Sequence, residues 1–284
     1  MRQPSVDAAQ RDAAAGRRYD RPLRNRCLKV HLLASILSRR CVPLASLLLG
    51  ACLSAVHAAD GGPSGHEGEE PWKLTTGVYA VSGGGQQSAQ ALDVNLRRSG
   101  SFGNGWIGWY RQNSDGLTQW RAGWDRFFAA GPARIQPALQ VASGGFFGAT
   151  VSVEAGQPWF AGVGAGRTNL RPYVNLNFDP NDMVMASFGH RSDHDQVQLL
   201  LIADNRQHPD QRHLHLNWKT DRDGGEKLTW DILAKQGDVD GEHIRRVGAS
   251  VTYDWPRWSL RAAWDPKVNF TPQNMLRLSV ASRF

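Results

Sequence analysis

Cysteine is nearly absent and is confined to the start of the chain. The 284 residues contain three cysteines, Cys27, Cys41 and Cys52, and none lies beyond residue 58. A mature chain that begins at Ala59 can therefore form no disulfide and no thiolate metal site.

Net charge is also absent from most of the chain, although the formal total is +7. Residues 1–58 hold ten of the 33 basic residues and three of the 26 acidic ones, which leaves 23 of each from Ala59 onward. A balanced chain offers no field for phosphate binding, so we expect no nucleic-acid partner.

Residues 1–58 have the pattern of a signal peptide with an extended charged region. Arg39 and Arg40 precede an apolar run over 42–53, and small residues lead to Ala58, so we expect cleavage between Ala58 and Ala59. The run is shorter than the roughly 20 apolar residues that span a bilayer, which disfavours a helical anchor. In one alternative, residues 49–52 form a lipobox and Cys52 is lipidated. The long charged region also suggests that translation starts downstream of Met1, at a codon other than Met.

After a Gly-rich, acidic lead-in over 59–71, which we expect to be flexible and periplasmic, the sequence repeats one kind of unit. Apolar and polar residues alternate in segments of about ten residues that end in Gly, Asp, Asn or Pro, as in 92–97, 120–125, 213–219, 247–254 and 258–265. No helical period is present. This pattern predicts an all-β region from 72 to 284.

Fifteen segments have strand character: 72–82, 90–98, 104–112, 117–128, 133–142, 146–154, 158–167, 171–178, 183–192, 195–204, 211–220, 226–236, 244–254, 257–265 and 274–284. Bacterial single-chain barrels have even strand numbers, so one segment is miscounted, and we expect the error at 158–167 or within 257–284. Twelve or fourteen strands remain, and we expect fourteen. The connections look short, which disfavours a plug formed by a long loop, although the lead-in could enter the lumen.

Alternation alone does not separate a soluble sandwich from a membrane barrel. Three further features favour the barrel. The polar positions carry both signs of charge beside Gly, Ser and Thr, as suits a lumen. The chain ends with apolar residues in phase with Phe284. Tryptophan is frequent at apolar positions near strand ends, as in the aromatic girdles of membrane barrels: Trp106, Trp120, Trp159, Trp218, Trp255, Trp258 and Trp264.

An exported, cysteine-free chain of alternating strands with a C-terminal aromatic residue resembles bacterial outer-membrane β-barrel proteins over residues 72–284. The resemblance implies a transmembrane antiparallel up-and-down β-barrel in the cell outer membrane, among its lipids and lipopolysaccharide. It also implies that the last strand with Phe284 is the signal for the barrel-assembly machinery. The length and the run 171–179 are similar to small monomeric barrels such as the YaiO-type proteins or the oligogalacturonate-specific porins, from which we transfer no functional residue.

If the apolar positions face lipid, a row of charged residues faces the lumen: Asp93, Arg97, Arg121, Asp125, Lys219, Asp231, Lys235, Asp254, Arg261, Asp265, Arg277 and Arg283. These charges either form crossbars that hold the barrel together or line a passage for anions or oligosaccharides. Twelve or fourteen strands leave space for a narrow water-filled lumen. The sequence therefore predicts a small monomeric channel for small anionic or saccharide solutes. The alternative is a structural or exopolysaccharide-associated envelope barrel without an open pore.

A second alternative is a lipid esterase. His190 and Ser192 lie two residues apart on one strand face, as in the His-x-Ser pair of outer-membrane lipid hydrolases, and Asp204 could be the third residue. Two features disfavour it: the strand-like stretch 197–203 carries Asp204 toward the opposite membrane face, and Asp193 replaces the Asn expected after Ser192. We therefore expect no catalytic site.

Metal and phosphate motifs are weak. Five histidines lie between 190 and 215 (His190, His194, His208, His213 and His215), but only His213 and His215 share a strand face, so we expect no metal and no cofactor. The glycine runs 83–85 and 162–166 neither open a helix nor carry a Lys. They predict a turn and a strand whose neighbours approach closely.

Overall fold

The structure is a computed structural model that describes residues 71–84, 86–176, 179–239 and 241–284. The predicted signal peptide with its cleavage site, Cys52 and nearly all of the lead-in lie outside the described residues. Within the described part, no helix has the length and apolar character needed to cross a membrane.

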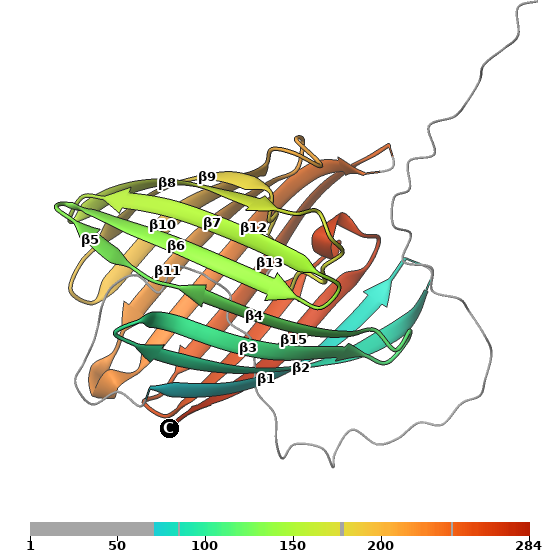
Figure 1. The fold of residues 1–284 in the computed structure, drawn as a ribbon, viewed down its shortest axis with the longest axis horizontal. Coiled ribbons are helices and arrows are strands. Elements are labelled where there is room, and N and C mark those ends of the chain that lie inside the picture. The colour runs from blue at the N-terminus through green and yellow to red at the C-terminus, as the bar shows by residue number, and fades with distance from the viewer. Residues whose placement is uncertain (1–70, 85, 177–178, 240) are drawn as a thin grey trace, which may run out of the picture. The chain divides into compact units, whose positions relative to one another are not determined.

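The described chain consists of antiparallel strands and two short 3₁₀ segments (Figure 1). In order they are β1 (Trp72–Gly83), β2 (Gln86–Gly100), β3 (Gly103–Gln112), β4 (Thr118–Asp125), β5 (Phe128–Ala130), β6 (Ala133–Ala142), β7 (Phe146–Ala155), β8 (Trp159–Thr168), β9 (Met183–Arg191), β10 (Asp195–Asp204), β11 (Arg212–Asp221), η1 (Asp223–Gly225), β12 (Lys227–Val239), β13 (Glu242–Asp254), β14 (Trp258–Asp265), η2 (Val268–Phe270) and β15 (Asn274–Arg283).

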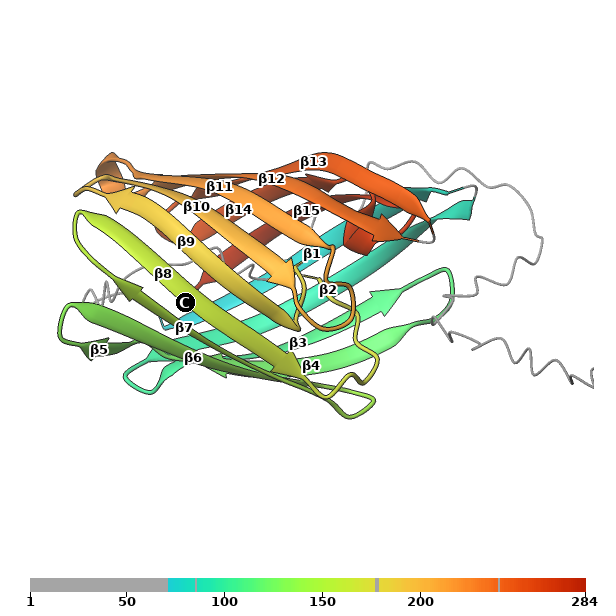
Figure 2. The ribbon, with the colours of Figure 1, turned by 90° about the horizontal axis from the view of Figure 1, so that it is seen from above.

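The strands close into a barrel of fourteen. Each strand pairs with its neighbours in sequence except that β4 and β5 do not pair with each other, and β1 also pairs with β15. The three-residue β5 and the longer β4 both pair with β6, so they are two parts of one interrupted strand. The expectation of fourteen strands in an up-and-down barrel is confirmed, and Figure 2 shows the strands surrounding a common interior.

The barrel has two different ends. At the terminal end, β1 begins beside the end of β15, and the backbones of Trp72 and Phe284 exchange two hydrogen bonds of 3.1 and 3.0 Å. The opposite end, the loop end, carries the connections 169–182, 205–211 and 266–273.

The miscounted strand is 171–178, so the expectation that it lay at 158–167 or within 257–284 is wrong. Residues 169–176 and 179–182, the described parts of the β8–β9 connection, contain no strand. We call this connection the lumen loop. Pro172 and Pro180 cannot donate to a β-ladder, and between them Leu176 is buried inside the barrel with Val174 partly buried beside it. The prediction that all connections are short is also wrong.

The outer face of the barrel is apolar. Val78, Leu199 and Val247 are 51%, 47% and 62% exposed, while their strand neighbours in the other phase are more buried, except for Arg246. Aromatic residues gather near both ends on this face, with Trp120 and Trp264 near the loop end and Trp159, Trp218 and Trp258 near the terminal end. Such a surface matches the lipid-facing band and girdles of a transmembrane barrel.

Trp106 is an exception to the predicted girdle. It lies in register with Arg97 and Gly123 on the lumen face, and the Arg121 guanidinium is 5.8 Å from its ring centroid. Ile107 and Trp109 take the outward phase of β3 instead, so the assignment of Trp106 to the lipid face is wrong.

The glycine-rich strand β8 approaches its neighbours closely, as predicted. A Cβ at Gly164 would lie 2.5 Å from Met185 Cε and 2.7 Å from the Val151 carbonyl oxygen. Gly83 and Gly84 form a turn with φ angles of +98° and +71°, which confirms the other assignment.

Candidate functional site

The lumen face carries all of the charged residues that the sequence placed there. Asp93, Arg121, Asp125, Lys235, Asp265 and Arg277 are buried, whereas Arg97, Lys219, Asp231, Asp254, Arg261 and Arg283 are partly exposed. These positions alternate along their strands with exposed apolar residues. The interior of the barrel is therefore polar and contains both signs of charge.

One crossbar joins β4 to β2. Arg121 Nη2 donates to Asp93 Oδ1 at 2.6 Å, and the two side chains are 3% and 0% exposed. The Tyr79 hydroxyl donates to the second Asp93 oxygen at 3.4 Å, and the Arg277 guanidinium lies 5.1 Å from the Tyr79 ring centroid. This buried group ties four strands together: β1, β2, β4 and β15.

Other ion pairs connect strands elsewhere on the lumen face. Lys235 on β12 donates to Asp265 on β14 at 2.5 Å, with both side chains buried. Nearer the terminal end, Arg283 donates to Asp254 at 2.6 Å. Many of the inward charged residues are therefore held in ion pairs that connect strands of the barrel.

Among the described residues, Arg97 and Arg261 each have a buried donor without a protein acceptor. The Nε atoms of Arg97 and Arg261 are buried and have no hydrogen-bond partner among the described residues. Arg261 uses Nη2 to donate to the Ser250 hydroxyl at 3.1 Å. Because buried N–H groups are rarely left unpaired, these two donors can bind water or a solute oxygen in the lumen.

The lumen loop crosses the interior and was missed by the sequence analysis. The Gln119 side chain on β4 clamps the Val174 backbone, with its amide nitrogen donating at 3.1 Å and its oxygen accepting at 2.9 Å. Tyr173 stacks on Phe146 with ring centroids 4.2 Å apart. Leu176 is 1% exposed and packs among residues of β1, β2, β3 and β15. Pro172 inside the supposed strand and Pro180 just after it were the signal that could have revealed this loop.

The end of the lumen loop is fixed at the rim by Asp182. Its carboxylate accepts from the Thr168 backbone at 3.1 Å, from the Thr168 hydroxyl at 2.5 Å and from Arg206 at 3.1 Å. Burial alone would raise the pKa of Asp182, but the hydrogen bonds from Thr168 and the charge of Arg206 outweigh it and lower the pKa below its usual value.

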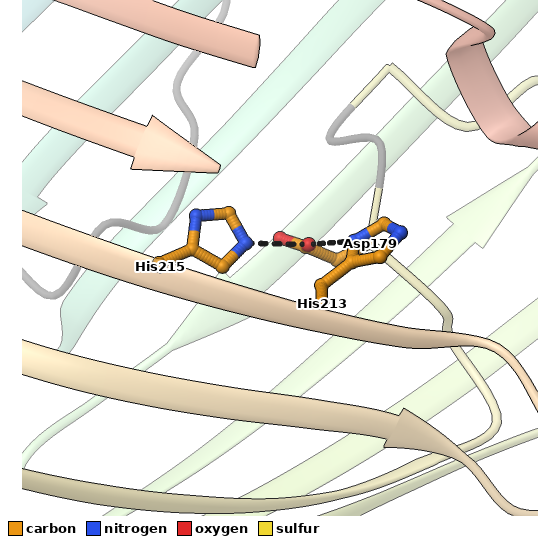
Figure 3. Close-up of side chains that lie close together, drawn as sticks. All are labelled: Asp179, His213 and His215. Carbon is orange, nitrogen blue, oxygen red and sulfur yellow. Dashed lines mark hydrogen bonds and ion pairs between the residues drawn. The ribbon is translucent and has the colours of Figure 1, made fainter. Parts of the chain in front are cut away.

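A second group fastens the lumen loop to β11 (Figure 3). Asp179 Oδ1 lies 2.8 Å from His213 Nδ1 and 3.0 Å from His215 Nε2. The other ring nitrogen of His215, Nδ1, lies 2.9 Å from Asp231 Oδ1 on β12. His213 and His215 share a strand face, as the sequence indicated, but Asp179 was missed because residues 171–178 were assigned to a strand.

Of the five histidines between 190 and 215, His190, His194 and His208 do not join this group. His190 faces outward, with its ring 4.7 Å from that of Trp159, and His194 and His208 are exposed in connections.

The residues of the esterase hypothesis are not brought together. Ser192 lies in the β9–β10 turn, where its hydroxyl contacts the Asp195 backbone. Asp204 lies at the loop end of β10 and accepts from the backbones of Arg206 and Gln207. With His190 on the outer face, the proposed nucleophile Ser192 and the proposed base His190 are not in contact, and the structure contradicts this arrangement.

Closed topology, an apolar exterior and a charged lumen crossed by a loop define the class of this chain: it is a transmembrane β-barrel. No family model and no curated protein matches the sequence.

Solved structures of other barrels are similar at low identity. Outer membrane protein Omp33 of Acinetobacter baumannii is 9% identical with a TM-score of 0.46, over 76% of this chain and 99% of that one. A mutant of the Rh. blastica porin is 10% identical with a TM-score of 0.41, over 76% and 99%. Salmonella typhi OmpF, in a complex with daunomycin, is 7% identical with a TM-score of 0.40, over 74% and 97%. TM-scores this low carry no argument about function, and the class rests on the barrel's own topology.

Proposed function

We propose that this chain is a small monomeric channel of the cell outer membrane for small anionic or saccharide solutes, with the lumen loop narrowing the passage. In barrels of this class the short turns face the periplasm and the longer loops face outward. The terminal end is then periplasmic and the lumen loop folds in from the outer side.

The observation that supports anionic or saccharide solutes is the arginine-rich wall of the lumen. Arg97, Arg121, Arg261 and Arg277 lie on β2, β4, β14 and β15, within one contiguous run of strands. Arg97 and Arg261 each keep a buried Nε without an acceptor among the described residues. Carboxylate, phosphate and hydroxyl oxygens are the groups that such guanidinium donors bind.

The outer face of the barrel supports a location in the outer membrane. An apolar band with aromatic girdles suits outer-membrane lipids and lipopolysaccharide. Phe284 is 55% exposed at the closing seam of the barrel, where the barrel-assembly machinery can read it.

Planar-bilayer recording of the purified protein tests the proposal. We expect single-channel conductance with anion preference in a salt gradient, and Arg97→Gln with Arg261→Gln should shift the reversal potential toward cations because two lumen charges are lost. Arg111→Gln, which removes the same charge from an exposed position on the outer phase of β3, is the matched control and should leave the reversal potential unchanged. Cation preference in the wild type, or equal shifts in the control, would overturn the solute class.

A barrel without an open pore is the second candidate, favoured by the burial of Leu176 among lumen residues. Replacing residues 171–181 with a short Gly-Ser linker separates the two. A channel conducts before and after the replacement, whereas a closed barrel conducts only after it.

A further inference from the structure

We propose that Asp179, His213 and His215 form a binding site for a divalent transition-metal ion of the Zn²⁺ type, which fastens the lumen loop to strand β11. Each residue offers one ligand atom, and the three atoms lie within 4.8 Å of one another. His213 and His215 come from alternate positions of one strand, and Asp179 comes from the loop.

The spacing suits a small ion after a slight opening. Around a tetrahedral Zn²⁺ with ligand distances of about 2.0–2.2 Å, neighbouring ligand atoms lie roughly 3.4 Å apart. The carboxylate oxygen is now 2.8 and 3.0 Å from the two nitrogens. The carboxylate oxygen therefore has to move away from each nitrogen by a few tenths of an ångström, and the two imidazoles have to turn so that their nitrogens, now within 4.8 Å of each other, reach the same spacing. Lumen water can supply a fourth ligand.

The surroundings orient both imidazoles. Asp231 contacts His215 Nδ1, which places the lone pair of Nε2 toward Asp179 when Nδ1 carries the proton. A carboxylate on the far nitrogen of a metal-bound histidine is the usual outer partner of such ligands. His213 stacks on Phe270 with ring centroids 5.5 Å apart and has no partner at Nε2 among the described residues, so Nδ1 makes its polar contact.

The donor set selects the class of ion. Two imidazole nitrogens and one carboxylate oxygen suit Zn²⁺ and similar ions, whereas Mg²⁺ and Ca²⁺ prefer sets made of oxygen alone. The histidine side chains are 1% and 8% exposed, and that of Asp179 is 20% exposed. The loop carboxylate is thus the part of the site that lumen water reaches.

Calorimetric titration of Zn²⁺ into the full-length protein, expressed without an affinity tag and purified in detergent, tests the site. We expect one strongly bound equivalent and no comparable binding of Mg²⁺. Asp179→Asn and His215→Gln should weaken Zn²⁺ binding by at least about 100-fold, and Asp231→Asn by about 10- to 100-fold. His243→Gln is the matched control, because His243 also contacts a carboxylate, Asp238 at 2.6 Å, but belongs to no group of three donors among the residues that the structure describes. Its binding should equal that of the wild type.

A second measurement needs no variant and covers the case in which a substitution prevents folding. Zinc K-edge X-ray absorption of the wild-type protein with one equivalent of Zn²⁺ should show imidazole nitrogen and oxygen ligands at about 2.0–2.2 Å. A spectrum without imidazole ligands, absence of a stoichiometric Zn²⁺ equivalent, or an equal loss in the His243→Gln control would overturn the proposal. Neither measurement requires conductance, so the site can fail or succeed independently of the channel function.

Discussion

Removing Arg121 should destabilise the barrel because Asp93 would remain buried without its charged partner. The two side chains are 3% and 0% exposed and 2.6 Å apart. In the Arg121→Gln variant Asp93 keeps the Tyr79 hydroxyl at 3.4 Å. Breaking one partner of a buried ion pair costs about 3–5 kcal/mol. Because Arg277 also interacts electrostatically with Asp93, we expect the lower end, about 3 kcal/mol.

Urea unfolding of the folded barrel in detergent, followed by tryptophan fluorescence, measures this loss. With a denaturant slope of about 1–3 kcal/mol per molar urea, the midpoint should fall by about 1 M or more. The double variant Arg121→Gln, Asp93→Asn removes both charges and should recover at least half of the loss, because the remaining cost is that of a neutral polar pair.

Arg134→Gln is the matched control. Arg134 is 20% exposed, and its partner Glu154 keeps a second contact to Arg191 at 3.0 Å, so its loss should stay below about 1 kcal/mol. The reasoning is refuted if the Arg121 and Arg134 variants lose equal stability, or if the double variant is as unstable as Arg121→Gln alone.

Two further predictions concern the rim and the seam. The pKa of Asp182 is lowered in the folded protein, so its stabilisation is complete above the pKa of an unfolded aspartate, about 3.9, and is lost as the pH falls through the lower folded pKa. Asp182→Asn should therefore reduce the free energy of unfolding by about 1–2 kcal/mol at neutral pH and remove much of the wild-type loss on acidification, and equal pH dependence in both proteins would count against this. Deleting Phe284 should reduce the heat-modifiable protein in outer-membrane fractions without reducing export, because Phe284 pairs with Trp72 at the seam and an unclosed edge leaves backbone groups unsatisfied in lipid; wild-type amounts would contradict it.

The sequence predicts a strand correctly where one face of the strand meets lipid and the other meets the lumen. Alternation over 92–97, 213–219 and 258–265 corresponds to β2, β11 and β14. The error at 171–178 has a physical cause. Val174 and Leu176 alternate with Asn175 as in a strand, but both pack inside the barrel rather than at lipid.

Trp106 shows that the sequence also does not decide which face of a strand a tryptophan occupies. A tryptophan fits the lipid interface and also fits the lumen where a glycine faces it, as Gly123 does here. Composition cannot choose between these two positions, because the choice depends on the neighbouring strand.

The sequence by itself determined the all-β class, the inward phase of the charges and a shared face for His213 and His215, because these follow from the two-residue period of a single strand. Only the tertiary structure decided which charges meet. Arg121 contacts Asp93 across 28 positions of the chain, and Asp179 contacts His215 across 36. The period of a strand fixes the face of a side chain, but its partner is set by barrel closure and by the path of a loop, and neither leaves a local pattern.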